Sequence, residues 1–354
     1  MRERLPSIEL LRFILALLVV IYHYFYFGAA SGVLSIEPIG VSVLPYFVLA
    51  VDTFFIVSGF VILFSAEKRS CSAFVVSRFA RLGPALLVCS TITLCAITFS
   101  GSFAKGTTFI RWLASITVLP LTFANGLDRS LWSLRYEIIF YAIVAGVVWR
   151  GLTYKRIALV AYFLIALNAV YIVRWSIADR MLMQNFGSLF ALGIFLYVHR
   201  NYRIPLVAWI ICALVAFMTC VVEVSRVAGL LHQPMQWTGT AIASVVTIGA
   251  FPAFLLMQPK SEILIRLCAL AGRASYPLYV LHQTAGYVVI TWLLTIFPAH
   301  ALAIQIVTLL GMIGFATLFS SLIEPQIASV YRMAGFYLED LFGYWRGNRC
   351  AQNR

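Results

Sequence analysis

An arginine and a histidine, Arg12 and His23, interrupt the otherwise apolar stretch RFILALLVVIYHYFYFG at residues 12–28. Eleven residues turn an α-helix by roughly 1100°, so the two side chains share one face and lie about 16 Å apart along the axis. Glu9 falls near the same face. A charge at bilayer depth costs at least about 2.5–3.5 kcal/mol, so we expect this polar stripe to face the protein interior. His23 could then take a proton from a hydroxyl group. Alternatively, Arg12 reaches the membrane interface and His23 only packs between helices.

Two carboxylates lie in apolar stretches at a depth that overlaps that of His23. Asp52 belongs to VDTFFIVSGF, and Glu137 belongs to LWSLRYEIIFY. A carboxylate next to an imidazole sets its orientation and tautomer, which a histidine base requires. The three side chains therefore predict a proton-transfer site, or else a buried polar network that only holds helices together.

A pair of arginines, Arg78 and Arg81, stands in the stretch SRFARLGP, which the hydropathy pattern places in a loop between two spans. Residues three apart are neighbours on a helical face. Two guanidinium groups in that arrangement can hold a phosphate through charge-assisted, bidentate hydrogen bonds. The alternative is the ordinary excess of basic residues on the cytoplasmic side of a membrane protein.

Hydroxyl groups and an imidazole follow in the stretch RASYPLYVLHQ, which contains Ser275, Tyr276, Tyr279 and His282. Because we expect this stretch to open a span at residue 275, these side chains are predicted to lie in its cytoplasmic half. The tyrosines and Pro277 are equally typical of an interface and a helix kink.

The elements that must position these residues are membrane-spanning helices. The chain has 354 residues, of which 62% are hydrophobic and 11% charged, whereas soluble domains average about 25% charged. We expect an all-α integral membrane protein with about ten transmembrane helices, and a surface or re-entrant segment at 109–124. The predicted spans are 8–28, 43–65, 84–100, 131–149, 156–173, 185–199, 204–222, 237–257, 275–296 and 301–323.

The basic residues are spread over short loops rather than gathered on one polar face. A net charge of +13 therefore indicates membrane topology and not nucleic-acid binding. Most of these residues fall on one side, which predicts that both termini are cytoplasmic. The seven cysteines form no metal-like cluster with histidines, so we expect no metal.

Taken together, these motifs resemble the acyltransferase 3 family of polytopic membrane acyltransferases. The resemblance covers most of the chain, and the combination of motifs is specific although each motif alone is weak. The matching elements are Arg12 and His23 with ten residues between them, VDTFFIVSGF, Arg78 and Arg81 followed by Pro84, WSLRYE from Trp132 to Glu137, ASYPLYVLH from Ala274 to His282, and Glu324 with Pro325.

This resemblance implies a multi-pass protein of the cell (inner) membrane that transfers an acyl group, usually acetyl, from cytoplasmic acyl-CoA to a hydroxyl of a cell-surface or exported saccharide. The partners would be membrane lipid, acyl-CoA and the glycan acceptor. His23 would be the catalytic base, with Asp52 or Glu137 as its partner. The expected donor-binding side chains are Arg12, Arg78, Arg81, Ser275 and Tyr276.

Three positions depart from the family pattern: Ala50, Gly83 and Arg135. Arg135 either pairs with Glu137, which would make that carboxylate structural, or faces the outer interface. We expect an acyltransferase domain at 1–325, a cytoplasmic tail at 326–354 and no appended soluble domain. Outward segments 29–42 and 101–130 are expected to help select the acceptor. The alternative function is a transporter or flippase for a saccharide or an anionic solute.

Overall fold

The computed structural model describes residues 5–101, 108–117, 126–174, 183, 185–335 and 337. These residues form an all-helical protein without strands, in which nine helices are long and apolar enough to cross a membrane. The predicted all-α membrane fold is therefore confirmed. The α-helices are α1 (Pro6–Tyr22), α2 (Gly28–Ala30), α3 (Ala50–Ala66), α4 (Cys71–Phe99), α5 (Thr108–Thr117), α6 (Trp132–Trp149), α7 (Tyr154–Arg174), α8 (Gly187–Val198), α9 (Leu206–Leu230), α10 (Trp237–Leu256), α11 (Glu262–Ile296) and α12 (Ala301–Leu318).

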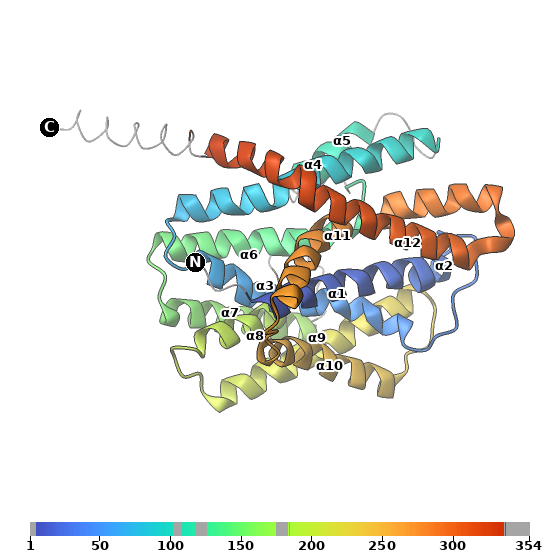
Figure 1. Cartoon of the computed structure of the whole chain (residues 1–354). Coiled ribbons are helices and arrows are strands. Elements are labelled where there is room, and N and C mark those ends of the chain that lie inside the picture. Colours follow the sequence, from blue (N-terminus) through green and yellow to red (C-terminus); the bar gives the residue numbers. More distant parts are fainter. Residues whose placement is uncertain are drawn as a thin grey trace.

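Helix α1 occupies the middle of the bundle. It packs against α11, α3 and α10, while α4, α5 and α12 lie on one side of it and α9 and α10 on the other (Figure 1). The first half of α11 crosses its neighbours steeply, and Pro277 lies inside this 35-residue helix. The stripe of Glu9, Arg12 and His23 is thereby surrounded by protein on several sides.

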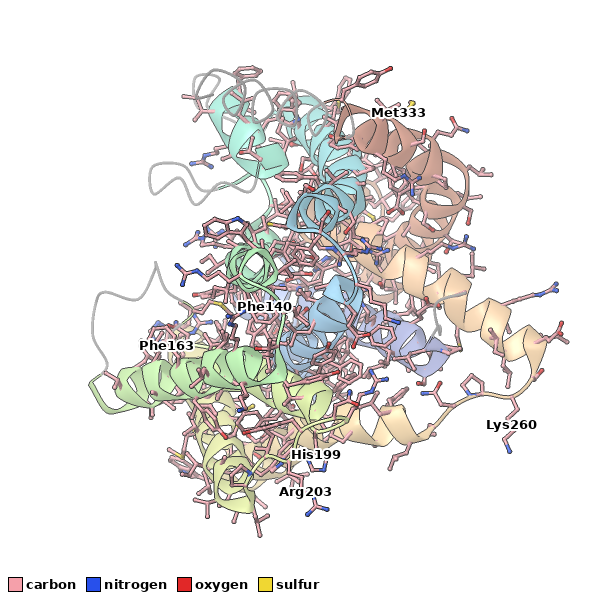
Figure 2. The ribbon with its side chains drawn as sticks, turned by 90° about the vertical axis from the view of Figure 1, so that its left-hand side faces the viewer. Phe140, Phe163, His199, Arg203, Lys260 and Met333 are labelled. Carbon is pink, nitrogen blue, oxygen red and sulfur yellow. The ribbon has the colours of Figure 1, made fainter. Side chains whose placement is uncertain are left out.

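The outer surface of the bundle is apolar, as a lipid-facing surface must be. Figure 2 shows Phe163 on the outer side of α7, where it is 60% exposed, and Phe140 in the interior, where it is fully buried. The basic side chains Arg203 and Lys260 project from loops at the edge of the molecule.

Helix α8 is the exception among the predicted spans. With 12 residues it is about 18 Å long, which is too short to cross a bilayer core of about 30 Å by itself. Nearly all of its residues are buried. Gly59 of α3 and Gly193 of α8 face each other, and a Cβ atom on Gly193 would lie 2.0 Å from the Ile56 carbonyl oxygen. These glycines let the two backbones pack in direct contact.

Two π-helical turns interrupt the helices next to the predicted site residues. The first, His23–Phe27, follows α1 directly, and the second, Phe319–Ile323, precedes Glu324. A π turn leaves backbone carbonyls without their usual partners and is frequent at functional sites. Here Gln305 Nε2 donates to the Tyr24 carbonyl over 2.5 Å. This hydrogen bond joins the first π turn to α12.

Several predicted spans are shorter than the helices that contain them. Helix α9 ends at Leu230 instead of residue 222, and two helix starts also differ. Helix α4 starts at Cys71 instead of residue 84, so Arg78 and Arg81 lie within a helix and not in a loop. Its start is capped by Ser70, whose hydroxyl oxygen accepts the Ala73 N–H over 3.1 Å. Helix α11 starts at Glu262 instead of residue 275. The hydropathy pattern missed both starts because arginines lower the mean hydropathy of these amphipathic first turns.

The remaining predicted segments are described only in part. Residues 109–117 of the predicted segment 109–124 belong to α5, and residues 118–125 lie outside the described residues. Residues 102–107 of the outward segment 101–130 lie outside them as well. After the second π turn the helix continues to Gly335, whereas 336 and 338–354 of the predicted tail are not described.

Candidate active site

His23 is the first residue of the π turn that follows α1, and it is half-buried at the wall of a cavity. Its Nδ1 atom lies 2.8 Å from the Val19 carbonyl oxygen and 3.1 Å from Nε2 of His282. The two ring centroids are 4.9 Å apart. The histidine of α1 therefore has a second histidine, from α11, as its side-chain partner.

The hydrogen bonds of His282 determine the tautomers of both rings. His282 is fully buried, and its Nδ1 lies 2.7 Å from the Tyr279 carbonyl oxygen, which can only accept. Nδ1 of His282 is therefore the donor, and in a neutral ring Nε2 is then an acceptor. His23 must donate from Nδ1 to Nε2 of His282, with the Val19 carbonyl sharing the hydrogen. Assigned in this way, Nε2 of His23 keeps a free lone pair.

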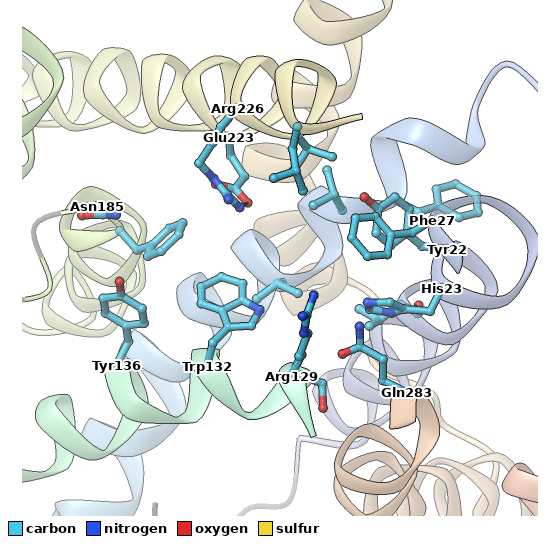
Figure 3. A pocket seen from close by; sticks show the side chains of 18 of the residues that line it. Tyr22, His23, Phe27, Arg129, Trp132, Tyr136, Asn185, Glu223, Arg226 and Gln283 are labelled. Carbon is cyan, nitrogen blue, oxygen red and sulfur yellow. Dashed lines mark hydrogen bonds and ion pairs between the residues drawn. The ribbon is translucent and has the colours of Figure 1, made fainter. Parts of the chain in front are cut away.

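The cavity beside His23, called here the His23 cavity, has a volume of about 460 Å³, within the range of small-ligand sites. Figure 3 shows the imidazole directed into it opposite Trp132 and Tyr136. Its aromatic lining comes from six parts of the chain: Tyr22, Phe27, Phe47, Trp132, Tyr136, Tyr171, Phe186 and Tyr279. Its charged lining consists of Arg129, Arg135, Glu223 and Arg226. The cavity thus offers flat apolar surfaces together with guanidinium groups.

Asp128 is a buried carboxylate that the sequence analysis did not single out. One of its oxygens accepts the Ser130 N–H over 2.8 Å, and the other accepts the Thr284 N–H over 2.9 Å. Burial raises the pKa of Asp128, while these bonds favour its charged form. By joining the start of α6 to α11 next to His282, Asp128 supports the histidine pair. Its signal in the sequence is an aspartate two residues before Ser130, a helix N-cap pattern.

The two carboxylates predicted as partners of His23 lie elsewhere. Asp52 is buried on α3 toward α9, within electrostatic range of Glu223, and among the described residues its Oδ1 atom has no hydrogen-bond partner. Glu137 accepts a hydrogen bond of 2.5 Å from the Tyr141 hydroxyl. Within the part of the chain that the structure describes, neither carboxylate is hydrogen-bonded to His23.

Glu137 instead lies with the predicted donor-binding arginines around two small cavities of about 40 and 30 Å³, called here the arginine cavities. Both are lined by Arg12, Ser58, Glu137 and Tyr276. The larger adds Ser133, Ser275 and Tyr279, and the smaller adds Arg78, Arg81 and Tyr141. The structure therefore brings together all five side chains predicted to bind the donor.

Contacts within the arginine cavities hold these side chains in place. The Arg78 guanidinium lies 5.7 Å from the ring centroids of both Phe74 and Tyr141, at cation–π distance. The Ser275 hydroxyl donates to the Gly272 carbonyl over 2.7 Å. Glu324, directly after the second π turn, lies within electrostatic range of Arg81 and offsets part of the positive charge.

Tyr279 separates the two kinds of cavity. It lines the His23 cavity on one side and the larger arginine cavity on the other, as Val51 does. Its hydroxyl lies 2.7 Å from the Ser133 Oγ and donates to the Ser130 carbonyl over 2.9 Å. The cavities consequently form a series through the bundle, from Arg78 past Arg12 and Tyr279 to His23.

Arg135 does not pair with Glu137 among the described residues, although they are two apart in sequence. Arg135 lines the His23 cavity, whereas Glu137 lines the arginine cavities on the other face of α6. The same described residues contain no group of three or more histidine, cysteine, aspartate or glutamate side chains arranged to hold a metal ion.

Comparison with known proteins gives a family match and no individual relative. The model of one family, Acyl_transf_3, described as an acyltransferase domain, matches residues 5–323, nearly the whole chain. No curated protein and no solved structure matches.

Proposed function

As a member of the acyltransferase 3 family, this chain is a multi-pass membrane acyltransferase, and we propose that its donor is acyl-CoA and its acceptor a saccharide hydroxyl. Acetyl-CoA is the simplest donor. The acceptor would be a cell-surface or exported glycan, the cell (inner) membrane the location, and the Arg78 side of the bundle the cytoplasmic side. The observation that carries this proposal is the histidine pair at the end of a series of cavities that begins at paired arginines.

The arginine cavities are the proposed donor site. Arg78 and Arg81 offer two guanidinium groups to the phosphates of CoA, and guanidinium binds phosphate in bidentate fashion. Arg12 lies further along the series, where the pantetheine arm would run. Cavities of about 40 and 30 Å³ hold only about one water molecule each, so donor binding must widen them. Displacement of the Tyr279 side chain would open the way to His23.

His23 is the proposed general base. The acceptor hydroxyl oxygen attacks the thioester carbonyl carbon while its proton passes to the free Nε2 of His23. A C–O bond forms, the C–S bond then breaks, and the proton returns from His23 to the CoA thiolate. His282 accepts from His23 Nδ1 throughout and so stabilises the imidazolium that forms between these steps. No serine or cysteine nucleophile is required.

The second large cavity near the proposed acceptor site suggests how a longer glycan would be accommodated. This cavity of about 330 Å³ is lined by residues 38–42 of the predicted acceptor-selecting segment 29–42 and by Gln233 and Gln236. It shares Val227 with the His23 cavity. Neighbouring sugar units could occupy it while the reacting unit lies beside His23.

The test replaces His23 and follows the acyl group. We expect His23→Ala to lower acylation of surface glycans at least about hundredfold, because general base catalysis contributes a factor of about 10²–10⁴. Mass spectrometry of surface glycans would measure it, with membrane abundance checked in parallel. The matched control is His300→Ala, since His300 is exposed in the turn before α12. Unchanged glycan masses with His23→Ala would refute the proposed function.

A further inference from the structure

We propose that the acceptor is anionic, and that Arg129 and Arg135 bind a carboxylate, phosphate or sulfate group that the glycan carries close to the acylated hydroxyl. This inference rests on the proposed function and names the class of saccharide that the His23 cavity accepts. Both arginines come from the start of α6 and the turn before it, and both line this cavity.

The two arginines are placed to meet a ligand. Arg129, Trp132 and Arg135 follow one another at intervals of three residues, which puts them on one helical face. In Figure 3 the Arg129 side chain extends into the cavity between Trp132 and His23. A sugar ring stacked on Trp132 would therefore have the Arg129 guanidinium and the His23 base within reach, and Arg135 lines the same cavity.

No described carboxylate neutralises the charge of these arginines. Among the described residues, neither Arg129 nor Arg135 has a carboxylate at ion-pair distance. The carboxylates around the cavity are engaged elsewhere or turned away. Both oxygens of Asp128 accept backbone N–H groups, and Glu223 accepts bonds of 3.0 and 2.6 Å from Arg226.

Two further carboxylates within the described ranges do not face these arginines either. Asp52 is buried and does not line the cavity, and Glu137 lines the arginine cavities beyond Tyr279. Counted over the described residues, the His23 cavity therefore carries two positive charges beyond those balanced by the Arg226–Glu223 pair. A neutral glycan would offer no opposite charge to the half-buried Arg135 or to the more exposed Arg129.

Membrane topology does not explain Arg135. A charge inside an apolar helix costs at least about 2.5–3.5 kcal/mol on insertion, and such charges commonly mark a ligand path. Arg135 is half-buried on the cavity wall, whereas Arg203 is exposed in a loop at the edge of the molecule. An anion on the acceptor would gain charge-assisted, bidentate hydrogen bonds from this side chain.

The experiment uses the full-length protein in cells that lack the chromosomal copy. We would produce wild type, Arg129→Gln with Arg135→Gln, the corresponding lysine pair, and Arg203→Gln as the matched charge-removal control. Tandem mass spectrometry then locates each acyl group on the surface glycans and measures its amount relative to protein in the membrane. The apparent KM for acetyl-CoA, measured on purified protein, reports separately on the donor site.

We expect the acyl group on a sugar that bears an anionic group, or on one bonded directly to such a sugar. The glutamine pair should lower acylation at least about tenfold, since each hydrogen bond to a charged group contributes a large part of the binding free energy. The lysine pair should recover at least about a third of the activity because it keeps the charge. The KM for acetyl-CoA should change less than about twofold, and Arg203→Gln should match wild type.

Three results would overturn the inference. They are acylation of a neutral glycan, full acylation by the glutamine pair, and a raised KM for acetyl-CoA, which would assign these arginines to the donor. If the glutamine pair does not accumulate in the membrane, the inference is tested by the position of the acyl group on the wild-type glycan and by the activity of the lysine pair. The same cells with His23→Ala separate the two proposals. If the acylated glycan is neutral and His23→Ala abolishes its acylation, only the inference of an anionic acceptor is wrong. If His23→Ala leaves acylation unchanged, the proposed function and this inference are both wrong.

Discussion

The His23 cavity and the arginine cavities lie on opposite sides of Tyr279 and differ in size and lining. The first has about 460 Å³ and an aromatic wall, whereas the others have about 40 and 30 Å³ and are lined by arginines and tyrosines. A rigid, bulky acceptor needs space that already exists. A flexible, phosphate-bearing donor arm can open a narrow passage as it binds. The difference fits the proposed function, in which the two substrates would reach one reaction point from opposite ends by different means.

The largest effect within this comparison concerns His282, which we regard as a positioning residue. His282→Leu removes the acceptor for His23 Nδ1, so we expect kcat to fall about hundredfold, while the KM for acetyl-CoA changes less than about twofold. His282→Gln keeps an acceptor oxygen on the side chain, so its kcat should be at least about tenfold higher than that of His282→Leu. Steady-state kinetics on purified protein would measure both variants. A leucine variant that is folded and fully active would show that His23 does not need its partner.

An intermediate effect is expected in the arginine cavities. Arg78→Ala with Arg81→Ala should raise the apparent KM for acetyl-CoA about 10- to 100-fold and change kcat much less. In the proposed donor site the two guanidinium groups would bind phosphates far from the reacting carbonyl. Initial rates over a range of acetyl-CoA concentrations would show it. Arg203→Ala is the control, since Arg203 is exposed in a loop. An unchanged KM would show that the donor does not bind in the arginine cavities.

The smallest effect is expected at the boundary between the cavities. Tyr279→Phe removes the hydrogen bonds of the hydroxyl to Ser130 and Ser133. The ring should then be displaced more easily and admit both donor and water. We expect hydrolysis of acetyl-CoA without acceptor to rise about two- to fivefold, measured by release of free CoA thiol. Tyr46→Phe is the matched control, because the Tyr46 hydroxyl bonds only at 3.5 Å to Gln236, outside this region. Unchanged or slower hydrolysis would show that Tyr279 is no barrier.

Much of the fold was predictable because a bilayer imposes simple rules on the sequence. Apolar length alone indicated the all-helical membrane protein, and a helical period of 3.6 residues placed Arg12 and His23 on one face, which lines the series of cavities. The starts of α4 and α11 were not predictable from hydropathy. Their first turns carry arginines and lie beyond the apolar cores of these helices.

The partner of His23 was missed for the same reason. A span that begins at residue 275 places His282 in its cytoplasmic half, whereas the periodicity of the first span places His23 in the outer half. In the 35-residue helix that the structure shows, His282 lies well inside and meets the π turn at His23. Depth along separate helices could bring Asp52, Glu137 and His23 to similar levels, but it could not determine which way each side chain faces. Only the packing of α1 against α11 and α3, and of α3 against α6, decides that.

In the proposed function, donor and acceptor meet at His23 from opposite ends of the protein. The direct test reconstitutes the protein in vesicles in one orientation. Labelled acetyl-CoA is supplied only on the Arg78 side, and surface glycan from cells that produce the His23→Ala protein only on the His23 side. We predict that label appears on the glycan with wild type and stays at least about hundredfold lower with His23→Ala. Equal labelling by the two proteins, or labelling only when both substrates share one side, would contradict the account.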